Sequence, residues 1–293
     1  MKGDKSLFLT LVVYVVATSI LVASPVYNED ISTSSPLHFD IQSIRSIQNP
    51  KVRLERIREL ERRERKREAM VLLEEWLEAF PDHPDARSAV ITLSEVQTDL
   101  DRFIVFTRKL IVARPDSRAA RFSYFKLGET CLLKGETTPA LSAFSDFLCL
   151  NPSDPMRPKA LYYLARCLMS LDKYDKAIEA LDDLRRHHPD FAHSPDIFDA
   201  VSTCCIELGQ TREAARSLRF IISKFPNYSY LPRCHLSLGL CYEDLGNYQS
   251  ARGWYTELVR LFPKSLESGL AEIRLKDIES THPLPVCGQK IFE

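Results

Sequence analysis

The composition of this 293-residue chain excludes several classes of protein before any motif is considered. The formal net charge is -1, so no overall basic field exists to hold a nucleic acid, and we expect no nucleic-acid partner. Hydrophobic residues make up 45% of the chain, enough for an ordered core, and nine glycines are too few for a sheet-rich fold with many tight turns. The composition therefore favours helices.

The N-terminal segment is predicted to enter a membrane. An uncharged run of residues 6–27, rich in Leu, Val and Ile, follows Lys2 and Lys5. As a helix this run would reach roughly 33 Å, against a hydrocarbon core of ~30 Å. We interpret residues 1–27 as a signal anchor that holds the chain in the membrane through residues 6–27. A cleaved signal peptide is the alternative, although Pro25 disfavours processing at the nearest small residues.

The charges on either side of this segment predict its orientation. Lys2 and Lys5 precede the run, whereas Glu29 and Asp30 follow it, so the positive-inside rule places the N-terminus in the cytoplasm. The rest of the chain would then be extracytoplasmic, in the periplasm if the source is bacterial. After cleavage it would be a soluble secreted or periplasmic protein. Residues 28–50 are polar and contain prolines, which is typical of a linker.

The next stretch, residues 51–80, is dense in charge of both signs. Glu59 and Arg63, like Glu61 and Arg65, are spaced i,i+4 in the order that stabilises a helix. We interpret the stretch as a solvated helical face with ion pairs. A patch for acidic partners or lipid headgroups is the alternative.

One pattern recurs four times at a spacing of 37 residues across residues 121–263. Each copy has a small residue, then an alanine, then a proline: Gly128, Ala140 and Pro152; Ala165, Ala177 and Pro189; Ser202, Ala214 and Pro226; Gly239, Ala251 and Pro263. Small side chains allow two antiparallel helices to cross closely, and a proline ends the second helix. Residues 51–120 carry two degenerate copies, in which the signature has faded.

The pattern resembles the tetratricopeptide repeat, W-x2-L-G-x2-Y, then A-x3-F, then P. The first clear copy carries the resemblance with Tyr124, Leu127, Gly128, Cys131, Ala140, Phe144 and Pro152. The resemblance implies an all-α fold, a right-handed superhelical solenoid of about six antiparallel helix hairpins over residues 51–281. The period of 37 residues exceeds the family's 34. Such lengthened repeats are similar to those of bacterial envelope proteins of the outer-membrane assembly and Tol-associated type.

Residues 265–280 are predicted to form a terminal helix that covers the last repeat, and residues 282–293 an extended tail. Leu266, Leu270 and Ile273 share one apolar stripe of this helix, and a second, partial stripe is formed by Leu275 and Ile278.

No catalytic motif is visible, and we expect neither an enzyme nor a cofactor or metal site. The three histidines His187, His188 and His193 fall in one loop without accompanying ligands. The eight cysteines lack a CxxC spacing. Three of them, Cys167, Cys204 and Cys241, occupy the same position in successive repeats, which we call one column of the repeat. Equivalent residues of stacked repeats are ~8–10 Å apart, too far for a disulfide, so these three should not bridge each other.

The resemblance points to a partner-binding groove lined by the second, fifth and ninth positions of the first helix in each hairpin. These positions hold Phe122, Phe125 and Glu129; Lys159, Tyr162 and Arg166; Asp196, Asp199 and Thr203; Arg233, Leu236 and Leu240. The aromatic rings of Phe122, Phe125 and Tyr162 would form an interface anchor. The cations of Lys159 and Arg166 would lie beside them. Alternatively the aromatic rings pack between repeats.

We therefore expect a membrane-anchored extracytoplasmic scaffold that binds a protein or peptide in the groove, within a cell-envelope assembly. One alternative is a cytoplasm-facing adaptor. Another is a noncatalytic partner subunit of an envelope or cell-wall enzyme.

Overall fold

The computed structural model describes residues 40–282, and every regular element among them is an α-helix. Twelve of the helices form six hairpins: α3 (Pro50–Arg62) with α4 (Lys66–Ala79), α5 (Ala86–Val96) with α6 (Leu100–Ala113), α7 (Arg118–Leu133) with α8 (Thr137–Leu150), α9 (Arg157–Ser170) with α10 (Tyr174–His187), α12 (Pro195–Glu207) with α13 (Thr211–Lys224), and α14 (Leu231–Asp244) with α15 (Tyr248–Leu261). The other helices are α2 (Ile41–Arg45), the one-turn α11 (Pro189–Ala192) and the terminal α16 (Leu266–Thr281).

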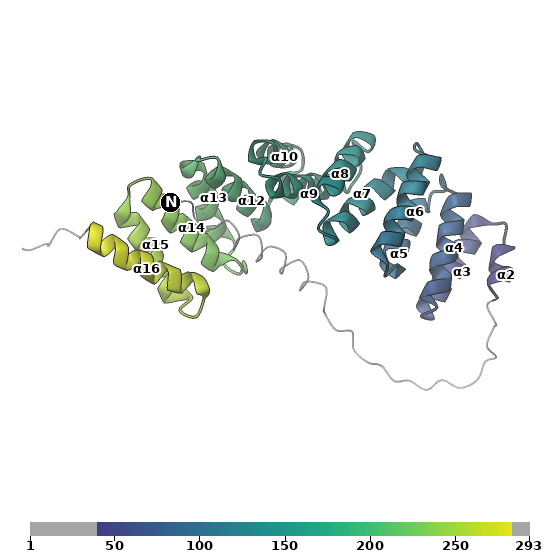
Figure 1. Ribbon diagram of the computed structural model, residues 1–293, viewed down its shortest axis with the longest axis horizontal. Helices are drawn as coiled ribbons and strands as arrows, with labels where there is room; N and C mark the ends of the chain where they lie inside the picture. Colours follow the sequence, from purple (N-terminus) through teal and green to yellow (C-terminus); the bar gives the residue numbers. More distant parts are fainter. Residues whose placement is uncertain (1–39, 283–293) are drawn as a thin grey trace, which may run out of the picture. The chain divides into compact units, whose positions relative to one another are not determined.

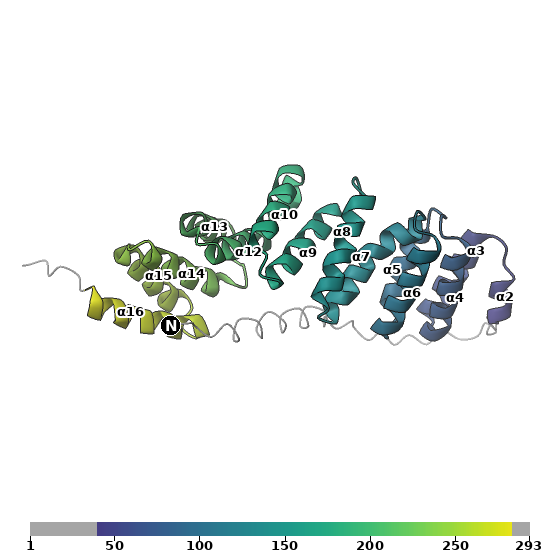
Figure 2. The same ribbon diagram turned by 45° about the horizontal axis from the view of Figure 1, so that its top comes forward.

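The hairpins stack one on the next in chain order, so that helices in contact lie close along the sequence, within one hairpin or in adjacent hairpins (Figures 1 and 2). We call α3, α5, α7, α9, α12 and α14 the first helices, and their hairpin partners the second helices. Apolar residues from several hairpins join in one core that runs from Leu161 to Cys241. The all-α solenoid of helix hairpins with a terminal helix is confirmed.

In the four clear copies of the repeat, one residue in the left-handed region follows the end of the first helix. Gly135, Gly209 and Gly246 have φ of 77°, 71° and 71°, as expected where a first helix must end sharply. The same column of the repeat holds Asp172, with φ of 55°, in the remaining clear copy. Glycine adopts this conformation without steric cost, whereas Asp172 is among the few residue types that tolerate it.

The small residues of the repeat lie where a side chain of the second helix presses against the first. A Cβ atom added to Gly128 would lie 2.7 Å from the Cε1 and Cζ atoms of Phe144, which is fully buried. No side chain could occupy that position without displacing the ring. The structure therefore shows why this position of the repeat is small: the two helices of the hairpin cross closely there, as predicted.

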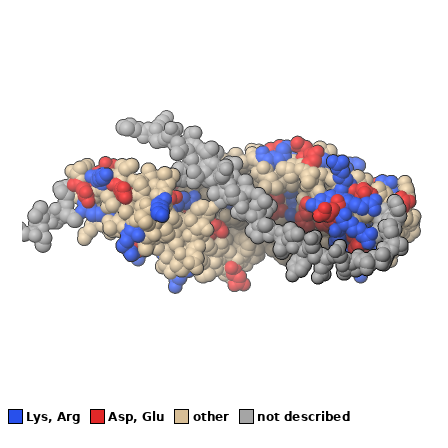
Figure 3. All heavy atoms as spheres, turned by 90° about the horizontal axis from the view of Figure 1, so that it is seen from below, with Lys and Arg blue, Asp and Glu red and all other residues tan. Residues whose placement is uncertain are grey.

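The first hairpin explains the charged stretch near the N-terminus. Helix α3 ends at Arg62, and a turn with Glu64 at φ 60° leads into α4. Glu59 pairs with Arg63 at 3.0 Å, as predicted. Arg65 lies beyond the helix end and pairs with Glu68 at 2.5 Å, so the predicted helical pairing of Arg65 with Glu61 is wrong. Figure 3 shows side chains of both charges intermixed over this end of the repeat array.

The terminal helix α16 packs on the last hairpin through the second of its two predicted stripes. Ala271 and Ile278 are buried against α15, and Leu275 packs beside them. The other stripe is exposed: Leu266, Leu270 and Ile273 have 72%, 46% and 56% of their surface accessible. The helix covers the last repeat while presenting a row of apolar side chains to solvent.

The predicted membrane segment and the C-terminal tail from residue 283 onward lie outside the described residues. Between residues 40 and 282, none of the helices has both the length and the apolar character that crossing a bilayer requires.

Candidate partner-binding face

The predicted groove positions lie on the first helices α7, α9, α12 and α14, and we call the surface they form, with the matching positions of α16, the first-helix face. Contacts across this face follow one rule of register. The residue at the second position of one repeat reaches back to the fifth or ninth position of the preceding repeat. Lys159 on α9 contacts Phe125 and Glu129 on α7 in this way. Arg233 reaches Asp199 in the same way.

Phe122 and Phe125 do not face a partner. They are 4% and 0% exposed, and the Phe125 ring packs on Phe144 and Phe147 with centroids 5.8 and 5.3 Å apart. Their placement in the groove is therefore wrong, and the alternative in which these rings pack between helices holds. Large aromatic rings contribute more by filling the space between hairpins than by remaining at the surface.

Much of the predicted positive charge beside these rings is neutralised within the protein. The Lys159 ammonium lies 2.9 Å from a Glu129 carboxylate oxygen, and Lys126 lies 2.9 Å from the other oxygen. Lys159 also lies over the Tyr163 ring, 5.3 Å from its centroid. These three charged side chains hold α7 and α9 together, so only their outer edges are available to a partner.

Tyr162 and Arg166 form the next part of the face. The Arg166 guanidinium lies 5.8 Å from the centroid of the half-buried Tyr162 ring, within the range of a cation–π contact. Burial raises the pKa of Tyr162 to about 12, so its hydroxyl stays protonated at neutral pH. Within residues 40–282, Arg166 has no carboxylate partner, which leaves a cation available for a ligand.

Asp199 forms the centre of a second cluster, where α12 meets α14. Arg233 donates a hydrogen bond to the Asp199 carboxylate, and the Tyr228 hydroxyl donates to Asp196 at 3.0 Å and to Asp199 at 3.4 Å. Burial raises the pKa of the Asp199 carboxyl above its ordinary value even though Arg233 opposes this shift. The Arg233 guanidinium also lies 5.0 Å from the centroid of the Tyr230 ring.

The sequence did not single out Tyr228 or Tyr230 as part of the face. Both lie in the loop that joins α13 to α14, which the longer repeat period extends beyond the usual length. The sequence feature that could have identified them is the presence of two tyrosines in a lengthened loop immediately before a first helix. Their contacts make Asp196, Asp199 and Arg233 a structural junction as well as surface residues.

The C-terminal part of the face is apolar. Leu236 is half-buried, and Leu240, at the ninth position of the repeat on α14, is 40% exposed. Leu270 and Ile273 lie 37 residues after Arg233 and Leu236, and therefore at the second and fifth positions of the repeat, on α16, a helix that contacts α14. By the register seen for Arg233 and Lys159, Leu270 faces these leucines. This continuation is not visible in the repeat signature, because Lys276 stands where the clear copies have a small residue.

The second face of α16 differs in character. In the other first helices, the corresponding positions pack against the second helix of the same hairpin. In α16 these positions hold the exposed residues Glu272, Lys276 and Glu279. Charged residues at those positions disfavour the stacking of another hairpin. The exposed apolar residues of α16 therefore belong to the first-helix face and not to an unfinished end of the array.

None of the residues between 40 and 282 brings together three or more His, Cys, Asp or Glu side chains in a geometry suited to a metal ion. His187 lies 2.9 Å from Asp183, on the preceding turn of α10.

Comparison with known proteins identifies the repeats. The sequence profile of the tetratricopeptide repeat matches residues 132–197 and 206–265. Among curated protein sequences, none matches the chain.

Several solved structures share the fold at low sequence identity. YrrB, described as a TPR protein with an unusual peptide-binding site, is similar at a TM-score of 0.57 and 16% identity, covering 69% of this chain and 97% of YrrB. PilW, described as a type IV pilus biogenesis factor, is similar at 0.53 and 19%, covering 78% of this chain and all of PilW. Pseudomonas aeruginosa PilF is similar at 0.53 and 15%, covering 80% and 99% of the two chains. The two profile matches, together with the stacked hairpins, identify residues 132–197 and 206–265 of this chain as tetratricopeptide repeats.

Proposed function

We propose that this protein is a noncatalytic scaffold, tethered to a membrane, that binds a protein partner along its first-helix face. The observation that carries the proposal is the exposed apolar row of Leu240, Leu270 and Ile273. The first-helix face also carries the Asp199 cluster at α12 and the cation of Arg166 further along, at α9. Apolar side chains that line up on one face, beside polar groups that can fix orientation, are typical of an interaction surface.

The partner segment is expected to match the face along its length. Near α14 and α16 it would supply apolar side chains, which gain by leaving water with Leu240, Leu270 and Ile273. Near α9 it would supply an acidic group for Arg166, which lies over the Tyr162 ring. Tetratricopeptide repeats provide a rigid, extended surface for such a segment.

The proposed tether is the uncharged run of residues 6–27, preceded by Lys2 and Lys5. This run has the length and the flanking charges of a signal anchor, which would place the repeats outside the cytoplasm. A role in a cell-envelope assembly follows from that placement. The absence of an overall basic field is compatible with a protein partner rather than a nucleic acid.

Partner binding can be tested with the full chain in its native membrane. We expect a double variant, Leu240→Asp with Ile273→Asp, to lose at least 90% of the partners that cross-link to the parent, or roughly a tenfold loss of affinity. Glu179→Lys on the second helix α10 is the matched control, because it also alters an exposed residue's charge. Equal recovery from all three chains would refute binding on the first-helix face.

Topology requires a separate test. Protease added to spheroplasts should digest the repeats without lysis if they are extracytoplasmic. Protection until lysis would instead support a cytoplasm-facing adaptor. Co-purification of a cell-wall enzyme in stoichiometric amount would indicate a partner subunit of that enzyme.

A further inference from the structure

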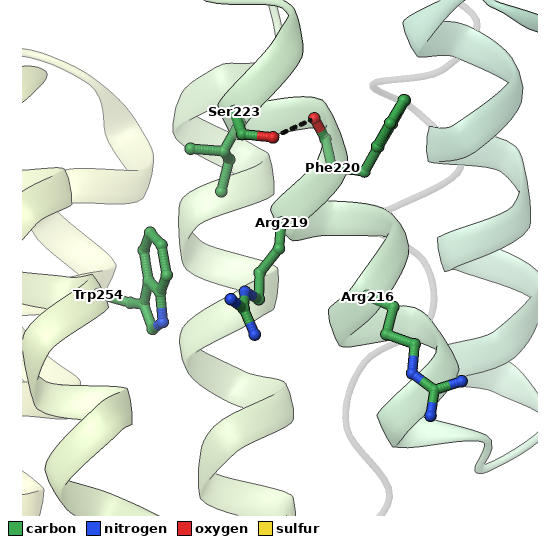
Figure 4. A pocket seen from close by; sticks show the side chains of 6 residues that line it. Arg216, Arg219, Phe220, Ser223 and Trp254 are labelled. Atoms are coloured by element: carbon green, nitrogen blue, oxygen red, sulfur yellow. Dashed lines mark hydrogen bonds between the residues drawn. The ribbon is translucent and has the colours of Figure 1, made fainter.

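A hollow of about 440 Å³ lies on the opposite side of the hairpins, between the second helices α13 and α15 (Figure 4). Its lining comes from Arg216, Arg219, Phe220, Ile222 and Ser223 of α13, and from Trp254 of α15. Figure 4 shows the Arg219 side chain extending from α13 beside the indole of Trp254. Cationic and aromatic groups thus border one open space.

The α13 wall departs from the repeat pattern in charge. In α10, one period earlier, the columns of Arg216, Arg219 and Phe220 hold three acidic residues: Glu179, Asp182 and Asp183. The reversal replaces three carboxylates by two guanidinium groups and one aromatic ring. Among the second helices of the clear copies this reversal is confined to α13, because α8 and α15 carry no arginine in these columns.

The α15 wall departs from the pattern in size. Trp254 occupies a column in which the other clear copies hold small residues: Ala143, Ala180 and Ser217. The indole is half-buried and lies 5.7 Å from the His235 ring, measured between centroids. Its inner edge is therefore supported by α14, while its outer part remains in the hollow.

The cations of the hollow are available to a ligand. Arg219 is exposed and has no carboxylate partner within the part of the chain from residue 40 to 282. Arg216 has only a distant pair with Glu213, at 3.7 Å between two exposed side chains, which contributes little. Phe220 is held in place by Phe198, with ring centroids 4.4 Å apart.

We propose that this hollow is a second binding site, which takes an acidic protein segment carrying one large apolar side chain. The apolar side chain lies between Trp254 and Phe220, and neighbouring carboxylates pair with Arg219 and Arg216. Guanidinium groups suit this task because they bind carboxylates through two parallel hydrogen bonds. The site is independent of the first-helix face, so either assignment can fail without the other.

Tryptophan fluorescence gives a direct test, because the chain has two tryptophans and only one borders the hollow. Trp76 is fully buried and donates its indole N–H to the Pro50 carbonyl at 2.9 Å, so its emission should stay constant. The probe is the peptide acetyl-Asp-Glu-Phe-Asp-amide, titrated into the full chain at low salt. Its neutral analogue is acetyl-Asn-Gln-Phe-Asn-amide.

The acidic peptide should shift the emission in a saturable manner, and Trp254→Phe should abolish the signal. Arg219→Gln should weaken binding about tenfold, as expected for the loss of charged hydrogen bonds. Arg212→Gln is the matched control, since Arg212 is exposed on the same helix but does not line the hollow. Raising the salt concentration should weaken binding in the parent chain.

Four results would overturn the proposal, the last of them a dimer formed through the hollow. The first is no spectral response to the acidic peptide, and the second is equal binding of the neutral analogue. The third is an equal effect of Arg219→Gln and Arg212→Gln, with circular dichroism showing both variants folded. A dimer that forms in the parent and is lost in Arg219→Gln would show that a second copy of this chain occupies the hollow, which also contradicts a separate partner.

Discussion

The ring of Tyr255 on α15 lies directly against the backbone of Gly239 on α14. A Cβ atom on Gly239 would come within 2.7 Å of both Cδ1 and Cζ of that ring, and closer still to Cε1. Gly128 bears the same relation to Phe144. The two middle repeats hold larger residues in the small column, Ala165 and Ser202, and smaller ones opposite, Leu181 and Leu218. Side-chain sizes in the two columns therefore compensate each other.

This relationship predicts the effect of adding one methyl group. Gly239→Ala should lower the free energy of unfolding by about 1–3 kcal/mol, because the fully buried Tyr255 ring must move. Gly269→Ala is the control: its Cβ meets open space in α16, so it should raise the free energy of unfolding by ~0.5–1 kcal/mol. Urea denaturation measures both. A second change, Tyr255→Leu, should restore part of the loss in Gly239→Ala, and a strictly additive double variant would contradict the account.

The terminal helix is predicted to depend on one ion pair. Arg274 of α16 binds the Glu243 carboxylate of α14, which also accepts a hydrogen bond from the Tyr255 hydroxyl at 2.5 Å. The Glu243 side chain is only 10% exposed, so Arg274→Gln leaves a poorly solvated charge and should cost about 1–2 kcal/mol. Hydrogen exchange in α16 should accelerate. The exposed Arg260 of α15 provides the control, and equal exchange in Arg260→Gln and Arg274→Gln would contradict the role of the pair.

A buried histidine should make the repeats sensitive to acid. His235 is 2% exposed, its Nδ1 atom has no hydrogen-bond partner, and burial lowers its pKa, with Glu257 opposing the shift. The unfolded chain therefore takes up the proton first as the pH falls. Stability is complete above the unfolded pKa of about 6.5 and is lost as the pH falls below it.

The variant His235→Leu tests this role, because leucine already occupies the equivalent buried position of an earlier repeat, Leu161. Between pH 7.5 and 5.5, the parent should lose more of its free energy of unfolding than His235→Leu does. Urea titrations at several pH values measure the difference. His193→Gln, at an exposed position, should follow the parent. Identical pH profiles for the parent and His235→Leu would refute the role of His235.

The cysteines should differ sharply in reactivity. Cys149 is exposed, and the other described cysteines are buried and free: Cys131, Cys167, Cys204, Cys205, Cys234 and Cys241. Burial raises the pKa of Cys204 and Cys234 to about 12, which suppresses the reactive thiolate. In a Cys287→Ser chain, Ellman's reagent should modify one thiol quickly and the rest only at the rate of unfolding. Several fast thiols in the folded chain would contradict the burial.

The sequence predicted the fold well because the repeat constrains packing. Columns such as Gly239 and Ala251 must be small wherever two helices cross, so their spacing is visible without a structure. Turn positions are only partly visible in the sequence: Gly135, Gly209 and Gly246 recur at the repeat spacing, whereas Asp172 adopts a positive φ at the same repeat position without a glycine to mark it. The break after Arg62 was missed for the same reason, since Glu64 adopts a positive φ in a charged stretch.

The candidate site was harder to predict, because a column fixes where a residue lies and not whether it is exposed. Phe125 and Tyr162 share a column, yet Phe125 is fully buried among Phe144, Phe147 and Tyr163, and Tyr162 is only half-buried. The difference depends on neighbouring side chains of the second helix. The hollow beside Trp254 was missed because it arises from residues that depart from the repeat.

Site-specific photo-cross-linking in the native membrane tests the central claim, partner binding on the first-helix face, most directly. The photoreactive residue p-benzoylphenylalanine would replace, in separate chains, Arg166, Leu240 or Glu179, the last of which is exposed on the second helix α10. Our account predicts that one partner is captured from positions 166 and 240 and not from position 179. Capture of that partner from position 179, with none from positions 166 and 240, would contradict it.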